Sequence, residues 1–438
     1  MAGLNFDAIP DISTPFRFYL TAPIFVIFAS LLLAFHGDSI WLSRWMPVTL
    51  AVTHLVALGT MAMIMIGSLF QVMPVLCGAP IPINGWRLTL FHSIYSIGIV
   101  ALSAGFLGWA NFGIAYILLS ASLSYFIFKL GQALLFNAKG EQTRFPILLS
   151  IIALSALMIL GLFLLSGYLW TQLPALGKSL TNLHAGVGAF GWVMLLIMAV
   201  SFQVIPMFHV TPSFSARWRN GLVLSSALGL VISALSIQEV STHWGWVICI
   251  TSALFYCGIT LEKLGKRKRK LPDIVVTYWR FGLINLMLSC VLLLWLVVPF
   301  THPIWAIQWH SKLEVLIGFV FSLGFVLAII QGMLLKIVPF LITLHLQRIM
   351  MKNPMSMIPL PDHYQLISRK RMKYQFNLYL ALFISIVICF FAPHLTVLIA
   401  IAFTANWLCI ANNIFHALRQ YRDYRNQLTS TAPNTMPT

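Results

Sequence analysis

Twelve long apolar stretches follow one another along almost the whole chain. Each is long enough to cross about 30 Å of hydrocarbon as a helix. The expected spans are 17–36, 47–76, 88–107, 111–134, 146–167, 181–208, 219–238, 243–262, 277–300, 311–345, 374–393 and 395–418. Because 60% of the residues are hydrophobic and only 8% are charged, a soluble domain is excluded. The sequence therefore predicts an all-α integral membrane protein that forms a single membrane domain, with no removable signal peptide.

The net charge of +17 is concentrated in one of the two sets of loops. Basic residues cluster in 261–273, in 369–373 and after the last span, whereas the opposing loops carry only Arg44, Lys178 and Lys312. By the positive-inside rule, the basic loops and both termini face the cytoplasm, and the basic runs contact anionic lipid headgroups. We expect a multi-pass protein of the bacterial cytoplasmic (inner) membrane that binds membrane lipids and no nucleic acid.

A short pattern occurs three times at an even spacing. The segments are GSLFQVMPVL (67–76), AVSFQVIPMF (199–208) and GMLLKIVPFL (332–341). In each copy a glycine precedes the proline by fifteen residues; the pairs are Gly59 and Pro74, Gly191 and Pro206, and Gly324 and Pro339. This spacing predicts three four-helix pseudo-repeats, 1–140, 141–272 and 273–420, which form a ring of twelve helices about a pseudo-threefold axis. Helices 2, 6 and 10 are expected inside the ring, and 421–438 is expected to be a disordered cytoplasmic tail.

One polar residue occupies the same position in each copy of the pattern: Gln71, Gln203 or Lys336. A polar side chain at membrane depth needs a partner or water, so all three are expected to face inward. Two interpretations remain open. Each side chain satisfies a carbonyl group released by the proline three residues later, or the three line a pore, a proton route or a ligand site.

Three of the twelve histidines lie within predicted spans, away from the helix ends. His54 and His184 occupy near-equivalent depths in helices 2 and 6, and His92 lies in helix 3. Facing imidazoles followed by glycines suit axial haem ligation if the glycines let a macrocycle approach, and they suit copper equally. An interhelical hydrogen bond is the structural alternative. The methionines near the histidines are interpreted as packing residues more than as ligands; they are Met61, Met63, Met65, Met73, Met194 and Met198. The six cysteines are interpreted as small core residues; they are Cys77, Cys249, Cys257, Cys290, Cys389 and Cys409.

The architecture resembles subunit I of the haem-copper oxidase superfamily, which includes nitric oxide reductases and the related NnrS-type membrane proteins. The resemblance covers essentially the whole chain, and it rests on twelve helices, cytoplasmic termini, three units and a histidine near the outer end of helix 2. In that family this histidine, here His54, is an axial ligand of the low-spin haem. The resemblance therefore implies haem b, with copper as a further candidate, at His54 and His184, and His92 is a further metal candidate.

The chain also departs from the oxidase pattern. Helix 6 reads NLHAGVGAFGW in place of an HPEVY-like motif, no adjacent histidine pair occurs, and helix 10 has no histidine through its core. The complete binuclear centre cannot be assembled, so oxygen reduction by the oxidase mechanism is not expected, and NnrS-type proteins are the closer relatives. No acidic residue lies at mid-membrane, which argues against proton pumping.

Two functional hypotheses follow from these residues. In the first, the protein binds haem b or copper through His54 and His184 for electron transfer, nitric oxide response or haem and metal handling, with an electron donor or a second membrane subunit as partner. In the second, it is a cofactor-free permease or channel for a small solute, with Gln71, Gln203 and Lys336 along the route. A purely structural assembly partner is a third possibility.

Overall fold

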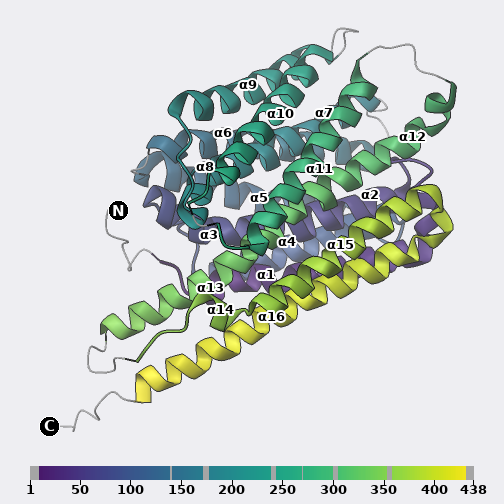
Figure 1. The fold of residues 1–438 in the computed structure, drawn as a ribbon. Coiled ribbons are helices and arrows are strands. Elements are labelled where there is room, and N and C mark those ends of the chain that lie inside the picture. The colour runs from purple at the N-terminus through teal and green to yellow at the C-terminus, as the bar shows by residue number, and fades with distance from the viewer. Residues whose placement is uncertain are drawn as a thin grey trace.

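The computed structural model describes residues 9–138, 141–170, 177–237, 243–268, 270–298, 304–352 and 358–430. Every regular element among these residues is a helix, and twelve helices are long and apolar enough to cross a membrane. All twelve coincide with predicted spans, which confirms an all-α multi-pass membrane protein. Figure 1 shows them as one bundle, with the N and C termini on the same side of the view. We call this side the termini end.

The spanning helices follow one another along the chain, and three of them consist of two α-helices joined by a π-helical segment. They are α1 (Ser13–Ile40), α2 (Pro47–His54) continuing into α3 (Met63–Cys77), α4 (Gly85–Phe106), α5 (Phe112–Gln132), α6 (Glu141–Leu169), α7 (Lys178–Gly186) continuing into α8 (Met194–His209), α9 (Ala216–Leu235), α10 (His243–Gly265), α11 (Ile274–Val297), α12 (Ile304–Phe319) continuing into α13 (Leu327–Lys352), α15 (Arg369–Phe391) and α16 (Val397–Ser430). The short helix α14 (His363–Leu366) lies between α13 and α15.

The second, sixth and tenth spanning helices are interrupted by a π-helical turn at the same place. The turns are Leu55–Ala62, Val187–Val193 and Val320–Val326. Each begins four residues before the repeated glycine, Gly59, Gly191 or Gly324. A π-turn inserts one residue into the helical register and is frequent at functional sites. The sequence pattern located these three positions, but it did not predict the π-turns.

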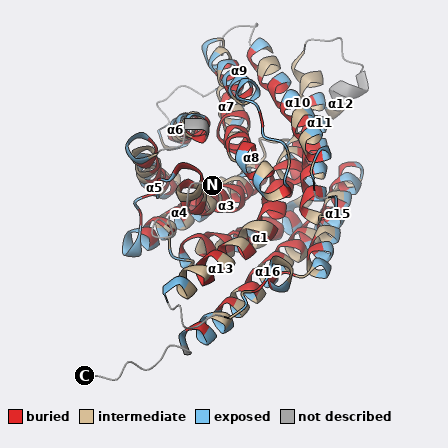
Figure 2. Cartoon of the chain, turned by 60° about the vertical axis from the view of Figure 1, so that its left-hand side comes forward, coloured by how far each residue is buried: buried red, intermediate tan, exposed pale blue. Residues whose placement is uncertain are grey.

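The same three helices are the most buried in the molecule. The buried share of the apolar core is 78% for Pro47–Cys77 and 67% for both Lys178–His209 and Trp309–Lys352, against at most 56% for the other spans. Figure 2 shows α3 and α8 mostly in the buried colour, while the surrounding helices carry exposed residues on their outer faces. The prediction that helices 2, 6 and 10 are the inner ones is therefore confirmed.

The surrounding helices pack in an order that recurs along the chain. Helix α1 contacts α3, α6 contacts α8, and α11 contacts α13; α4 packs on α5, α9 on α10, and α15 on α16. We call each set of four consecutive spanning helices a block, so that the three blocks begin at α1, α6 and α11. Between the blocks, α5 contacts α6, α10 contacts α11, and α16 packs against α1. The first and last spanning helices therefore lie side by side, and the chain closes on itself.

Two smaller predictions have different outcomes. All six cysteines are free and five of them are buried, as expected of small core residues. The tail prediction is wrong for 421–430, because α16 continues to Ser430. Polar residues of this segment extend a helix that is already formed. Adding a residue to an existing helix has a much smaller free-energy cost than starting a new helix. Residues 431–438 lie outside the described part of the chain.

Candidate functional site

His54 and His184 meet across the inner helices, as predicted. His54 is the last residue of α2, directly before the first π-turn, and His184 lies in α7, just before the second. The centres of their imidazole rings are 6.5 Å apart, and the ring planes are inclined by 25°. Both residues lie toward the end of the bundle opposite the termini. Two imidazoles from near-equivalent positions therefore face one another inside the protein.

The orientation of the His54 ring is set by its own helix. Its Nδ1 atom lies 2.8 Å from the carbonyl oxygen of Leu50. Because a carbonyl oxygen only accepts hydrogen bonds, Nδ1 must carry the proton, and in the neutral ring Nε2 then presents a lone pair. The ring of Phe106 covers one side of the imidazole, with ring centres 5.1 Å apart. His54 is thus held in one tautomer with a free donor nitrogen, as metal-binding histidines usually are.

His184 has a buried nitrogen without a hydrogen-bond partner. No hydrogen bond of good geometry reaches its Nδ1 atom among the described residues, although the backbone of Leu157 in α6 lies close to the ring. Helix α6 approaches this ring closely, since a Cβ atom built on Gly161 would lie 3.0 Å from the imidazole Cε1 atom. A buried, unpaired polar atom is unusual in a folded protein and calls for a ligand, an ion or water.

The repeated glycines serve helix packing and do not open a slot for a macrocycle. A Cβ atom on Gly59 would lie 2.4 Å from the ring of Phe25 in α1. On Gly191 it would lie 2.9 Å from Ala153 in α6, and on Gly324 it would lie 3.0 Å from Asn285 in α11. The expected role of these glycines in haem approach is therefore wrong, because the first helix of each block already fills the space.

His92 does not join the pair. Its Nε2 atom lies 3.0 Å from the Thr21 hydroxyl, and the ring of Phe18 packs edge-on against it. Fourteen residues of α4 separate His92 from Phe106, which is about 20 Å along a helix. The structure therefore does not bring His92 together with His54 and His184, and its candidate role as a metal ligand stays a prediction. Within the described ranges no group of three or more His, Cys, Asp or Glu residues could hold a metal ion.

The three polar residues of the repeated pattern have different surroundings. Gln71 is 3% exposed, and neither atom of its side-chain amide has a partner among the described residues. Gln203 is exposed and accepts a hydrogen bond from the Thr143 hydroxyl at 2.8 Å. Lys336 forms an ion pair with Asp273. The expectation that all three face inward is wrong for Gln203, and the partners of Gln203 and Lys336 are side chains, not proline-released carbonyl groups.

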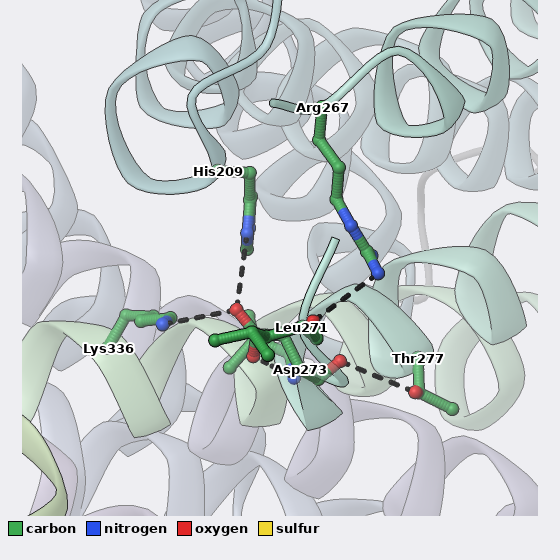
Figure 3. Close-up of polar contacts among 7 residues, drawn as sticks. His209, Arg267, Leu271, Asp273, Thr277 and Lys336 are labelled. Carbon is green, nitrogen blue, oxygen red and sulfur yellow. Dashed lines mark hydrogen bonds and ion pairs between the residues drawn. The ribbon is translucent and has the colours of Figure 1, made fainter. Parts of the chain in front are cut away.

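Lys336 belongs to a charged cluster at the termini end that sequence reasoning missed. Figure 3 shows Lys336 and His209 pointing at the carboxylate of Asp273, at 3.2 and 3.7 Å. Burial opposes the charged carboxylate, but the nearby His209 ring and the charge of Lys336 outweigh it, so the pKa of Asp273 lies well below its usual value. Asp273 also caps α11 by accepting from the Val275 N–H. Helices α8, α11 and α13 are joined at this point.

A second cluster of charged residues connects helices at the end of the bundle opposite the termini. Arg44, in the loop before α2, lies 3.2 Å from Glu314 of α12 and also donates to the side chain of Asn182 in α7. Both sequence positions carried a weak signal, because Arg44 is one of few basic residues on that side and Glu314 is the acidic residue nearest the inner helices. The network connects the three inner helices on the side where the histidine pair lies.

A chain of hydrogen-bonded polar residues links α11, α13, α15 and α16 inside the bundle. Its members are Tyr278, Gln331, Asn406, Gln375, Asn413 and Arg371. The bond between Gln331 and Asn406 is 2.6 Å long, and both residues are fully buried. No short motif marks these residues, since they come from four helices. Each finds partners inside the bundle, as polar groups in hydrocarbon require.

A cavity of about 120 Å³ lies among α3, α8 and α13, nearer the termini end than the histidine pair. Apolar side chains form most of its wall, and Gln71 is among the few polar ones. The cavity and the histidine pair are thus separate features of the same three inner helices.

The sequence matches no protein-family model, and no curated protein matches it.

Proposed function

We propose that this chain is a membrane protein with haem-copper oxidase subunit I-like architecture that holds a redox-active metal between His54 and His184. Electron transfer, nitric oxide response, or haem and metal handling are the activities that such a centre serves. The 6.5 Å between the two ring centres carries the proposal. An ion bound to one nitrogen of each imidazole at about 2 Å would put the ring centres roughly 6 Å apart.

The chemical state of the two rings supports the same conclusion. His54 is fixed with a free Nε2 lone pair by its bond to Leu50, and His184 has an unpartnered buried nitrogen. Neutral imidazole is a good ligand for copper and for iron. A bound copper or haem iron would supply one-electron transfer, while the surrounding helices hold the two rings in place. The Phe106 ring covers one side of the His54 imidazole.

Copper is the occupant that this packing favours. Phe25, Ala153 and Asn285 fill the space beside the repeated glycines, so a macrocycle would have to displace them. A single ion between two nitrogens needs no such movement, and two-nitrogen ligation is acceptable to Cu(I). Haem b, which the resemblance implies, is the second candidate for the same pair.

The repeated features support the proposed three-unit architecture. Three π-turns start at the same position relative to the repeated glycines, and the three inner helices are the most buried. The contacts among the outer helices recur from block to block and close into a ring. The basic loops lie at the termini end, so the positive-inside rule orients this end toward the cytoplasm of a bacterial inner membrane. An electron donor or a second membrane subunit is the expected partner.

Visible and electron paramagnetic resonance spectra of the purified protein test the metal proposal. The cells are supplied with haem precursor and copper. Copper predicts a colourless reduced protein that gives a Cu(II) resonance after oxidation, whereas haem predicts a Soret band. Either signal should disappear in His54→Ala and in His184→Ala and persist in His92→Ala, a matched control because His92 is also a histidine within a spanning helix. Absence of both signals from the wild-type protein would refute the proposal.

A cofactor-free permease is the second candidate function, and the cavity among the inner helices favours it. The cavity is confined to the half of the molecule nearer the termini, as in a transporter that opens to one side. A colourless, metal-free protein that moves a solute in reconstituted vesicles would support this candidate over the metal centre.

A further inference from the structure

The cavity is built from the same positions of the three repeated segments. Ile64, Leu196 and Ile329 line it at one level, and Val72, Val204 and Ile337 line it at another. Each set comes from equivalent places in α3, α8 and α13. The cavity therefore lies between the three inner helices, and all three contribute to its wall at matching positions.

Two buried polar groups in the cavity wall have no partner among the described residues. One is the side-chain amide of Gln71, which is 3% exposed and has both its nitrogen and its oxygen unpaired. The other is the indole N–H of Trp279 in α11, which is 2% exposed. Each unmade hydrogen bond of a buried group costs about 1 to 3 kcal/mol. Something that hydrogen-bonds is therefore expected in the cavity.

The other polar residues of the wall are already satisfied. The Ser68 hydroxyl pairs with the hydroxyl of Tyr19 at 3.1 Å. The Ser201 hydroxyl donates to the Met198 carbonyl oxygen and accepts from the hydroxyl of Tyr256 at 2.9 Å. The hydrogen-bonding demand is therefore concentrated at Gln71 and Trp279, on one part of an otherwise apolar wall.

The composition of the wall defines the chemistry of its occupant. No charged side chain lines the cavity, so an ionic ligand would lose its hydration without a counter-charge. The apolar wall offers a cluster of water molecules few of the two to four partners that each requires. An engineered apolar cavity of about 150 Å³ binds benzene, so a molecule of that size is close to the limit for this cavity.

We propose that this cavity binds a small uncharged organic molecule with a benzene-sized apolar body and a hydroxyl group. The hydroxyl accepts from the Gln71 NH₂ or the Trp279 N–H and donates to the Gln71 oxygen. Small phenols have this chemistry. Access is from the termini end, because Met207 lines the cavity and is also 46% exposed. The site does not depend on a metal at His54 and His184.

Equilibrium dialysis of the full-length purified protein against protein-free micelles tests this site, with radiolabelled phenol and benzene as probes. The micelle control subtracts partitioning into detergent. Val200→Trp and Ile330→Trp each place a large ring in the cavity. Gln71→Leu removes the hydrogen-bonding group at nearly constant volume. Gln203→Leu is the matched control, because Gln203 occupies the equivalent position in α8 but is exposed and bonds Thr143.

The wild-type protein should bind both probes saturably, with phenol tighter. Both tryptophan variants should abolish binding, and two independent variants guard against one that does not fold. Gln71→Leu should weaken phenol binding about tenfold and leave benzene binding unchanged, whereas Gln203→Leu should change neither. The inference is overturned if the wild type shows no saturable binding, or if the tryptophan variants bind phenol as the wild type does. Equal phenol binding by Gln71→Leu and wild type would overturn the assigned role of Gln71.

Discussion

His54 and His184 illustrate how a single side chain acquires a role through its neighbours. The carbonyl group of Leu50 selects the tautomer of His54. The Phe106 ring covers one side of the His54 imidazole, and the His184 imidazole of a neighbouring inner helix lies close to it. His92, a histidine in a neighbouring helix, is instead bonded to Thr21 and faces no second histidine. Location within a membrane helix is therefore not enough to identify a candidate metal ligand. The contacts of each imidazole ring are the better criterion.

The ion pair between Lys336 and Asp273 should contribute measurably to stability. Their side chains are 14% and 21% exposed, so removing one charge leaves the other largely buried. We expect Asp273→Asn to lower the free energy of unfolding by about 1 to 3 kcal/mol, and the double variant with Lys336→Met to recover part of that loss. Thermal unfolding in detergent measures both effects.

The matched control for this pair is Glu262→Gln. Glu262 and Lys266 also form an ion pair, but both side chains are more than half exposed, so the change should be close to neutral. An Asp273→Asn variant as stable as Glu262→Gln would contradict the assigned role of the buried pair.

His363 should make stability fall in mild acid. Burial and the charge of Lys336 lower the pKa of His363 to about 4, although Asp273 and Asp362 raise it. The unfolded chain binds the proton at a pKa of about 6.5, so the contribution of neutral His363 is complete above that value and is lost as the pH falls toward 4. We expect the melting temperature of His363→Gln to change less between about pH 7 and pH 5 than that of the wild type. Parallel pH profiles would show that His363 does not carry this dependence.

At the level of helices, the repeated glycines and the π-turns act together. Gly59, Gly191 and Gly324 each lie within a π-turn and against the first helix of the same block. Without a Cβ atom, each lets two helix backbones approach closely, which drives helix association in membranes. The π-turn that follows His54 shifts the register of the rest of the helix by about one residue. Position and packing of the histidine pair therefore depend on these turns.

Gly59→Ala should be markedly destabilising. Its Cβ atom would lie 2.4 Å from the Phe25 ring, which is itself 2% exposed and has little room to move. We expect a loss of about 1 to 3 kcal/mol in the free energy of unfolding, because overpacking forces neighbouring atoms apart. Gly221→Ala is the matched control, since nothing lies within 4 Å of its added Cβ atom, and it should be neutral or stabilising. Similar melting temperatures for the two variants would contradict the packing role of Gly59.

The sequence predicted helices better than it predicted side-chain partners. Length and hydropathy located all twelve spans, and the spaced glycine and proline pairs identified the inner helices. The expectation for Gln203 was wrong because matching positions of the sequence pattern do not share neighbours. Thr143 of α6 is within reach of Gln203, whereas the Gln71 amide has no partner among the described residues. The cluster of His209, Asp273 and Lys336 draws on residues far apart in the chain, so no local pattern could reveal it.

For the whole molecule, closure of the chain is the main structural feature. Helices α1 and α16 pack together although they lie at opposite ends of the sequence. Most of the long apolar side chains that remain exposed lie on the outer helices, where hydrocarbon is their solvent. The charged clusters at the two ends join the inner helices, so the centre of the bundle is fixed at both faces.

The proposed orientation makes a direct prediction for reporter fusions. Alkaline phosphatase fused after Gly108, which lies in the turn between α4 and α5 at the end opposite the termini, should be active because the proposed orientation puts that end in the periplasm. The same enzyme fused after Gly265, beside the basic run, should be inactive, and green fluorescent protein should give the reverse pattern. Active phosphatase at Gly265 would contradict the assigned topology.

The metal content of four purified proteins decides whether His54 and His184 hold a metal. Copper and haem iron are counted per chain in the wild type, His54→Ala, His184→Ala and His92→Ala, all prepared from cells with both metals in supply. We expect about one metal per chain in the wild type and in His92→Ala, and a parallel loss in both other variants, since neither imidazole alone holds the ion. A metal-free wild type, or wild-type metal content in either His54→Ala or His184→Ala, would contradict it.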